Sequence, residues 1–320
     1  MATSLFKMPF DVDRLRLTRV YESPELSRCQ AETMSCDKIR QIYGDLKFLE
    51  LHQDRPCTYT SLVTSIDGRI AFTDAPQGPL IAKKNKYDPA GADADWFILN
   101  MLRAVSDGVM LGAGTMNAEA DYTCHVFDQD MEDMRVENGK PPVPWNIVTS
   151  LDAADIPFGH VLFNTPEVPV MISTSRKGLA LVRENLGDAA YCVEVPGREA
   201  VTDGLIAGMQ AAQGKVLAIG TGDTAPDAQT ALYVLKRFGI HRLLVETPSY
   251  MHYLVSQKLM DELFFNYSCI YVGGQALTIG KFGREFTSED HPHTRMLSIH
   301  THSDHLLPSP QAPLRLSAEV

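Results

Sequence analysis

The residues with the clearest chemical potential stand where an apolar run of the chain stops at Glu246. Three aliphatic residues precede this carboxylate, a short polar turn over residues 247–249 follows it, and helical spacing resumes at Tyr250. A buried strand that ends in a polar turn at a helix start presents free backbone N–H groups and the positive end of the helix dipole, both of which bind anions. We therefore expect a ligand site beside Glu246. The alternative is that Glu246 only caps the helix, although Glu is a poor cap compared with Ser or Asp.

Two further loops carry residue types suited to the same ligand. One apolar run stops at Gly112, with Gly114 and Thr115 close behind it, and another ends at Ser150. Glycines let a ligand approach the backbone, Thr115 offers a hydroxyl, and Ser249 with the N–H groups of its turn can hold a pyrophosphate. Together the three loops predict a dinucleotide site, whereas the glycine loop alone is also typical of a tight strand-to-helix turn. The fingerprint G-x-G-x-x-G follows none of the predicted strands, which argues against an ordinary Rossmann domain.

These loops need a sheet whose strands bring their carboxyl ends to one edge. The chain alternates short apolar runs with amphipathic helical segments, which is the pattern of a mostly parallel sheet with helices on both faces. We therefore expect an α/β fold with its ligand at the carboxyl edge of the sheet. The predicted strands lie at residues 57–65, 107–112, 145–150, 168–175, 189–196, 215–220, 241–246 and 263–274. The predicted helices lie at residues 36–52, 92–106, 179–187, 202–213 and 227–239, the last closed by Gly239.

Length, composition and charge limit the function classes. The 320 residues are 44% hydrophobic and 22% charged, with a formal net charge of -11. Proteins that bind nucleic acids or anionic membranes concentrate Lys and Arg, so we expect neither partner. No apolar stretch approaches the roughly 20 residues that span a bilayer, and six scattered cysteines without a signal peptide indicate a reduced, cytoplasmic location. We expect an N-terminal extension packed on the body at residues 1–54, a main domain at 55–306 and a tail at 307–320.

Three other features have plainer explanations. His300 and His302 would share one face of a strand, but a metal site needs a third and a fourth ligand, so we predict no metal. The basic turn at Arg176 and Lys177 is suited to the 2′-phosphate of an NADP ribose, and its alternative is an exposed basic turn without a ligand. Asp67 begins an Asp-Gly pair, which by itself indicates only a turn.

Four segments in order resemble one enzyme family. They are "TSIDGRIA" at 64–71, "LRAVSDGVMLGAGT" at 102–115, "LLVETPSYMHYL" at 243–254 and "LMDELFFNYSCIYVGG" at 259–274. The set resembles the pyrimidine reductases of riboflavin biosynthesis, the reductase half of the bifunctional deaminase-reductase, over roughly residues 55–306. The resemblance implies a dihydrofolate-reductase-like three-layer sandwich, a homodimer, NADPH as hydride donor, and a small-molecule substrate whose opened ribose phosphate becomes a ribityl chain. The zinc-ligand motifs of the deaminase half, H-x-E and P-C-x-x-C, do not occur in this sequence.

The resemblance also implies roles for single residues. Arg103 and Glu246 match substrate contacts, Glu246 is also a candidate proton donor, and Asp67 lies in a turn that closes over the nicotinamide. An Arg fork grips phosphate bidentately and a carboxylate fixes a hydroxyl or amino group, so these residue types suit the task. The alternative for Arg103 is an ion pair on a helix surface. The positions assigned to the cofactor are Gly112, Gly114, Thr115, Glu119, Ser150, Arg176, Pro248, Ser249, Tyr250, Met251, Gly273 and Gly274.

The chain also departs from the family pattern. A family Ser and Trp after the first strand are replaced by Leu80 and Ala82, a second phosphate-binding Arg expected shortly after Glu119 is missing, and a double glycine is replaced by Thr247 and Pro248. These changes leave three functions open: a riboflavin-pathway pyrimidine reductase, a related reductase of another carbonyl, imine or pterin compound, and a non-catalytic NADP-binding protein. Fold alone does not decide among them.

Overall fold

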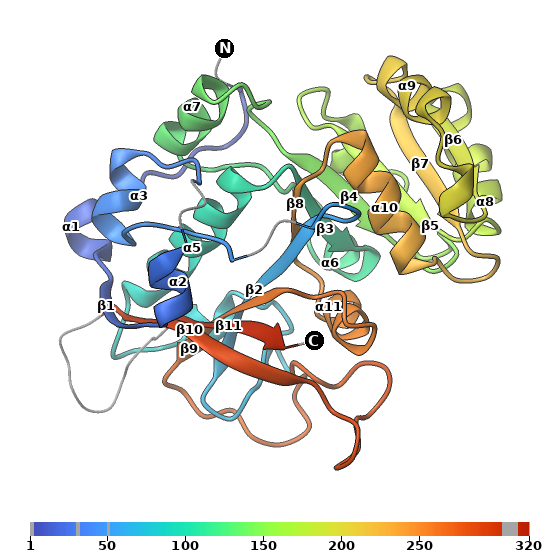
Figure 1. Ribbon diagram of the computed structural model, residues 1–320. Coiled ribbons are helices and arrows are strands. Elements are labelled where there is room, and N and C mark those ends of the chain that lie inside the picture. The colour runs from blue at the N-terminus through green and yellow to red at the C-terminus, as the bar shows by residue number, and fades with distance from the viewer. Residues whose placement is uncertain (1–2, 30–32, 50–51, 303–312, 320) are drawn as a thin grey trace.

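One large sheet organises the chain (Figure 1), and the computed structural model describes residues 3–29, 33–49, 52–302 and 313–319. Within these residues the sheet has eleven strands, and the eight from β9 to β6 run parallel while β11, β10 and β1 are added antiparallel at one edge. The predicted α/β class with a mostly parallel sheet is confirmed. Across the sheet the order is β1 (Thr18–Glu22), β10 (His293–Thr301), β11 (Pro313–Glu319), β9 (Glu262–Ser268), β2 (Cys57–Ser65), β8 (Arg242–Val245), β3 (Gly108–Gly112), β4 (Trp145–Thr149), β5 (Val170–Thr174), β7 (Val216–Thr221) and β6 (Ala190–Val195).

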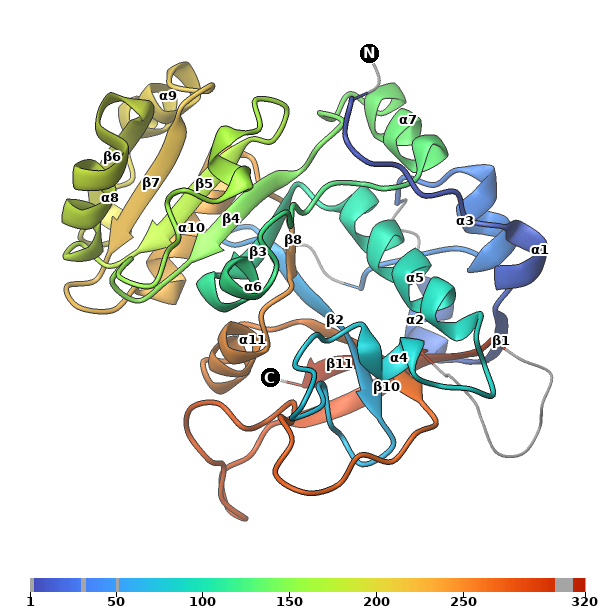
Figure 2. The ribbon, with the colours of Figure 1, turned by 180° about the vertical axis from the view of Figure 1, so that it is seen from behind.

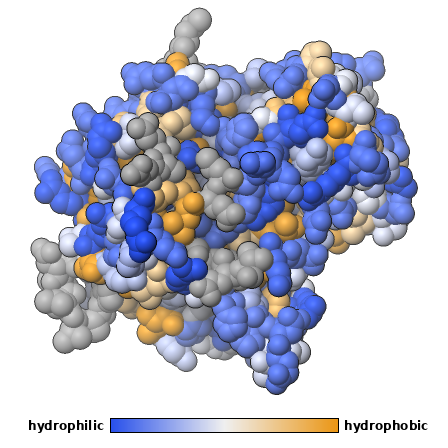
Figure 3. Space-filling model, viewed as in Figure 1, coloured by the Kyte–Doolittle hydropathy of each residue, from blue (hydrophilic) through white to orange (hydrophobic). Residues whose placement is uncertain are grey.

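Helices cover both faces of this sheet (Figures 1 and 2). In β3, Val109 and Leu111 pack into the core that includes α5, whereas Met110 between them packs into the core that includes α10, because successive side chains of a strand point to opposite faces. The surface in Figure 3 is mostly hydrophilic, so the apolar side chains gather mainly in these two cores. The helices of four residues or more are α1 (Val12–Leu15), α2 (Pro24–Arg28), α3 (Asp37–Ile42), α4 (Leu80–Lys83), α5 (Gly91–Val105), α6 (Ala113–Ala118), α7 (Gln129–Glu137), η1 (Val161–Asn164), α8 (Gly178–Leu186), α9 (Asp203–Ala211), α10 (Ala228–Phe238) and α11 (Pro248–Ser256).

Local signals explain where the helices near the carboxyl edge begin and end. α10 begins after Asp227, whose carboxylate accepts the Thr230 N–H at 2.6 Å, and it ends at Gly239 with φ of 118°. Glycine is the residue that adopts this left-handed conformation without a steric cost, so the predicted C-cap is confirmed. α11 begins with Pro248 in its first turn, where the missing N–H of proline has no helical partner to lose.

The described N-terminal residues form three short helices instead of the single long helix predicted. We expected a helix over residues 36–52, but α3 ends at Ile42 because Gly44 adopts φ of 91°, which a helix cannot continue through. The strand β1 was not predicted, since its side chains are largely exposed and lack an alternating apolar pattern. Leu15 and Ile39 nevertheless lie in the same core as α5.

The C-terminal residues also differ from expectation. Pro313–Glu319 forms β11 between β10 and β9, so this part of the predicted tail is a strand; residues 303–312, which include the start of that tail, lie outside the described residues. Pro313 is the first residue of this strand, where proline is tolerated. The last predicted strand, at 263–274, ends at Ser268, beyond which Gly273 and Gly274 adopt positive φ.

Candidate active site

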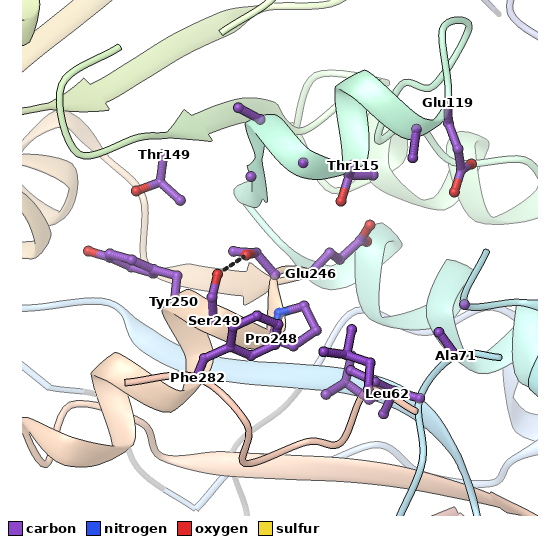
Figure 4. Close-up of a pocket in the computed structure, with 18 of the residues that line it drawn as sticks. Leu62, Ala71, Thr115, Glu119, Thr149, Glu246, Pro248, Ser249, Tyr250 and Phe282 are labelled. Atoms are coloured by element: carbon purple, nitrogen blue, oxygen red, sulfur yellow. Dashed lines mark hydrogen bonds between the residues drawn. The ribbon is translucent and has the colours of Figure 1, made fainter. Parts of the chain in front are cut away.

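One cavity of about 920 Å³ lies where β8, β3 and β4 end, beside β2. We call it the active-site cavity, and its volume is within the range of roughly 300–1,000 Å³ that small-molecule sites occupy. The three loops singled out in the sequence therefore meet as predicted (Figure 4). The predicted site residues that line it are Gly112, Gly114, Thr115, Glu119, Ser150, Glu246, Pro248, Ser249 and Tyr250.

The glycines where β3 joins α6 allow close packing at one position and leave open space at the other. A Cβ atom on Gly112 would lie 3.1 Å from the Thr247 hydroxyl oxygen, so glycine allows this loop to pack tightly against the start of α11. A Cβ atom on Gly114 would meet no atom within 4 Å, and Gly114 lines the cavity. Gly112 has φ of -97°, so a left-handed turn is not the reason for it.

The start of α11 faces the cavity without a side-chain cap. Thr247 is the N-cap residue, but its side chain accepts no hydrogen bond from the first turn, and its hydroxyl lies 3.2 Å from that of Ser249 (Figure 4). Pro248, Ser249 and Tyr250 all line the cavity. Backbone N–H groups of an uncapped first turn, together with the helix dipole, make an anion-binding position.

Glu246 is held in place by a buried ion pair with Arg103. The side chain of Arg103 has 0% exposure, and its Nε and Nη2 donate to Oε1 and Oε2 of Glu246, each at 2.7 Å. Tyr122 donates its hydroxyl to the same carboxylate at 2.7 Å, and the Arg103 Nη1 donates to the carbonyl of His125. Burial alone would lower the pKa of Arg103, but the Glu246 carboxylate raises it well above its usual range.

This geometry corrects two expectations. Arg103 does not line the cavity and its donors are engaged within the protein, so it is neither a direct substrate contact nor a surface ion pair. Glu246 does line the cavity, and the N-cap position of α11 belongs to Thr247 rather than to Glu246. Tyr122 was missed because its role depends on a contact with a residue 124 positions away in sequence.

Asp95 is a second cavity carboxyl that the sequence did not single out. It lies on α5 and its Oδ1 accepts a hydrogen bond of 2.6 Å from the side-chain amide of Asn266 on β9. Burial raises the pKa of Asp95 to about 6, although the Asn266 bond acts in the opposite direction. The Asn266 Oδ1 atom is buried and has no partner among the described residues. Asp95 lies in a helix with many apolar residues, and that context hid it.

Ser150 lies in the cavity wall next to another carboxyl group, that of Asp155. The Ser150 hydroxyl donates to Asp155 Oδ1 at 2.5 Å, and both residues line the cavity. Arg176 does not line it; its guanidinium, 39% exposed, forms an ion pair with Asp223. Glu119 at the opposite end is half-buried, and burial, with the nearby Asp121, raises its pKa.

Asp67 and the glycine pair hold a loop rather than line the cavity. Asp67 accepts hydrogen bonds from the Ser65 hydroxyl at 2.6 Å and from the N–H groups of Val272 at 3.1 Å and Gly273 at 2.8 Å. Burial of Asp67 opposes ionisation, but these hydrogen bonds outweigh it and lower the pKa to about 2. Neither Asp67, Gly273 nor Gly274 is among the lining residues, and the structure gives no support to their predicted ligand contacts.

Met251 is another predicted cofactor contact outside the wall of the cavity. Its side chain lies in the core on the α10 face of the sheet, with 2% exposure. Within the described residues there is no group of three or more His, Cys, Asp and Glu side chains placed to hold a metal ion. The helices in that part of the chain are all too short or too polar to cross a bilayer.

Comparisons with known proteins identify the family of the chain. The model of the RibD C-terminal domain family matches residues 57–304. A 2,5-diamino-6-ribosylamino-4(3H)-pyrimidinone 5′-phosphate reductase of Archaeoglobus fulgidus is 25% identical over 222 residues, which are 69% of this chain and 84% of that protein.

Solved structures share the fold at lower identity. A pyrimidine reductase-like protein of Corynebacterium diphtheriae superposes with a TM-score of 0.57 at 16% identity, over 88% of this chain and 98% of that one. RibD of Acinetobacter baumannii gives a TM-score of 0.53 at 17% identity over 83% of this chain, but the match spans only 59% of the RibD chain. The chain belongs to the RibD C-terminal domain family, the riboflavin-pathway reductase family that its motifs resemble.

Proposed function

We propose that the chain is a nicotinamide-dependent reductase that transfers a hydride to a small ribosylaminopyrimidine-like substrate. The relative from Archaeoglobus fulgidus is named as a reductase of a ribosylaminopyrimidinone phosphate. One observation carries the proposal: the turn where β3 joins α6 and the uncapped start of α11 meet in a single cavity. Such a pair of backbone donor loops at a sheet edge suits a dinucleotide.

The cavity fits a nicotinamide dinucleotide. The open space at Gly114 and the first turn of α11 would hold the pyrophosphate, with Thr115 and Ser249 supplying hydroxyls. Ser150 at the end of β4 would lie toward the adenosine side. When bound, the nicotinamide supplies a hydride to the substrate.

The chain's own residues prepare the substrate end. Leu62, Trp96 and Leu99 form an apolar wall, which excludes water from the reacting atoms. Glu246, fixed by Arg103, can orient a hydroxyl or amino group of the substrate. Asp95, with its raised pKa, can hold a proton at near-neutral pH and deliver it to the substrate atom that gains negative charge. Two carboxyls in different environments thus divide the orienting and protonating tasks.

We also propose NADPH rather than NADH as the donor. Arg176 lies beside the loop containing Ala225 and Pro226, which line the cavity, and its N–H donates to the Gly222 carbonyl. Its exposed guanidinium can turn from Asp223 toward a 2′-phosphate. Because Asp155 beside Ser150 opposes a second negative charge, we expect a preference of only about ten-fold, equivalent to ~1.4 kcal/mol.

A homodimer and a cytoplasmic location stay predictions from the resemblance and the cysteine pattern. The thiols of Cys29, Cys36, Cys124 and Cys192 form no disulfide within the described residues, which suits a reducing compartment.

Cofactor titration and turnover test the proposed function. Nicotinamide fluorescence should report saturable NADPH binding, and the bound cofactor should be oxidised when a diaminopyrimidinone riboside or its 5′-phosphate is added. Binding without oxidation of either compound would favour the non-catalytic alternative. Absence of NADPH and NADH binding would contradict the proposal itself.

A further inference from the structure

Asn266 on β9 is an unusual side chain for the interior of this sheet. It has 3% exposure, and the one hydrogen bond of its side chain to a described residue runs from Nδ2 to Oδ1 of Asp95, at 2.6 Å. The Asn266 Oδ1 atom is buried and accepts no hydrogen bond within the same residues. A buried acceptor without a donor costs free energy, and an apolar side chain of similar shape would avoid that cost. Stability therefore explains Asn266 poorly, and its contact with a carboxyl of the cavity wall indicates a function.

The hydrogen bond leaves one oxygen of Asp95 available to a ligand. Asp95 lines the active-site cavity with Trp96 and Leu99 of the same helix, whereas Asn266 lies behind the wall. In the part of the chain that the structure describes, no other group hydrogen-bonds to the Asp95 carboxyl. A protonated carboxyl carries its proton on one oxygen and accepts on the other, and Oδ1 already accepts the Asn266 N–H. The proton therefore belongs on Oδ2.

The surroundings of Asp95 suit an acid that holds a proton and can release it. Burial raises its pKa to about 6, and the hydrogen bond from Asn266 acts in the opposite direction because it favours the ionised form. No charged side chain contributes to this shift. The charged side chains on the elements next to α5 and on β9 include Arg14, Lys83, Arg135, Arg242, Glu246 and Glu262.

Resting on the proposed function, we propose that Asn266 is a positioning residue that holds Asp95 with Oδ2 available to deliver a proton to the substrate. Asp95 gives this proton to the nitrogen or oxygen of a C=N or C=O bond, as the carbon of that bond takes up a hydride from the nicotinamide cofactor. The O–H bond of the acid breaks, and the π electrons of the substrate double bond form the new bond to the proton. Asp95 is left as a carboxylate, which the Asn266 N–H stabilises.

Titration of the Asp95 carboxyl tests the contact without turnover. Asn266→Leu keeps the branched shape of the side chain but removes the donor. Ser268→Ala is its matched control, because Ser268 lies two residues along β9, on the same face, and its buried hydroxyl has no partner in the described part of the chain. The titration is followed by NMR in the ligand-free protein, with Asp95→Asn identifying the signal. We expect Asn266→Leu to raise the midpoint by about one pH unit and Ser268→Ala to leave it unchanged. An unmoved midpoint in Asn266→Leu would overturn the proposal.

The pH profile of reduction tests the catalytic consequence, with NADPH saturating and the diaminopyrimidinone riboside 5′-phosphate as substrate. In the parent, kcat/KM should be highest below about pH 6 and fall above it, because the reaction needs protonated Asp95. We expect Asn266→Leu to move this fall to higher pH and to lower the plateau by about ten-fold without lowering the Tm. Adding Asn266→Leu to Asp95→Asn should cost little more.

Two results of the rate measurements would show a merely structural role for Asn266 and overturn the proposal. They are an equal loss of kcat/KM in both backgrounds and a pH profile with the parental midpoint. A parent protein that neither binds nor oxidises NADPH would instead contradict the proposed function. The two failures are distinguishable because the carboxyl titration needs neither cofactor nor substrate.

Discussion

Replacing Glu246 by Gln removes the charge that faces Arg103 while keeping the size of the side chain. From the sequence alone, a substrate-facing Glu246 predicts a variant that folds normally and reduces slowly. The structure adds a stability loss, because the Arg103 side chain has 0% exposure and loses its ionic partner. Removing one member of a buried ion pair costs about 3–5 kcal/mol. At about 2.1 cal/mol/K per residue, the unfolding entropy of 320 residues converts this cost into a Tm drop of about 4–7 °C.

Calorimetric melting of Glu246→Gln, Arg103→Gln and the double variant tests this reasoning. Each single variant leaves one group of the pair uncompensated, so we expect the double variant to be less destabilised than the sum of the singles. Reduction by folded Glu246→Gln should slow by about ten- to a hundred-fold, since a charged hydrogen bond is worth about 1.5–3 kcal/mol. A Glu246→Gln protein that melts with the parent, or strictly additive losses, would refute the buried pair.

Three further predictions concern the acids and the basic turn. Because the pKa of Asp95 is raised, its contribution to stability is complete below its ordinary pKa of 3.8 and is lost as the pH rises through about 6. The variant Asp95→Asn should therefore gain about 1–2 kcal/mol in free energy of unfolding by urea at pH 8, gain less at pH 4, and reduce its substrate more slowly. A loss of stability at pH 8 would contradict this. Because its pKa is lowered, ionised Asp67 stabilises the fold above about pH 4, and this contribution is lost as the pH falls toward 2. The variant Asp67→Asn should therefore lower the Tm at pH 7 but change it little near pH 2. Equal losses of Tm at both pH values would argue against a charge effect. Arg176→Ala should weaken NADPH binding by about ten-fold and leave NADH binding unchanged in fluorescence titrations. Equal weakening of NADPH and NADH binding would show that Arg176 does not contact the 2′-phosphate.

The parallel part of the fold was predictable because its strands are buried on both faces. A strand such as the one containing Val109, Met110 and Leu111 must be continuously apolar because it packs into two cores. That pattern can be recognised in a single sequence. β11 could not be recognised, because its sequence contains no continuous apolar run; in the structure it pairs with β9 and β10. The end of α3 depends on the positive φ of Gly44, whose conformation the sequence does not fix.

The site residues likewise divide into those that the sequence predicts and those that it does not. Loops that follow predicted strands necessarily meet at one edge of a parallel sheet, so Gly114, Ser150 and Ser249 were found from their positions. Side-chain pairs far apart in sequence were not found. Arg103 and Glu246 are 143 positions apart, and each alone looked like a ligand contact. The same limit made the structural turn at Asp67 look like part of the site.

The central claim, that the active-site cavity binds the nicotinamide cofactor, is tested most directly by filling it. Gly114 and Gly204 are each the second residue of a helix, and a Cβ atom at either position meets nothing closer than 3.8 Å, but Gly204 lies outside the cavity wall. Both Leu substitutions should therefore fold, and melting curves should establish this. We predict that Gly114→Leu weakens NADPH binding at least a hundred-fold in a fluorescence titration while Gly204→Leu retains the parental affinity. Parental NADPH affinity in a folded Gly114→Leu protein would contradict the placement of the cofactor in this cavity.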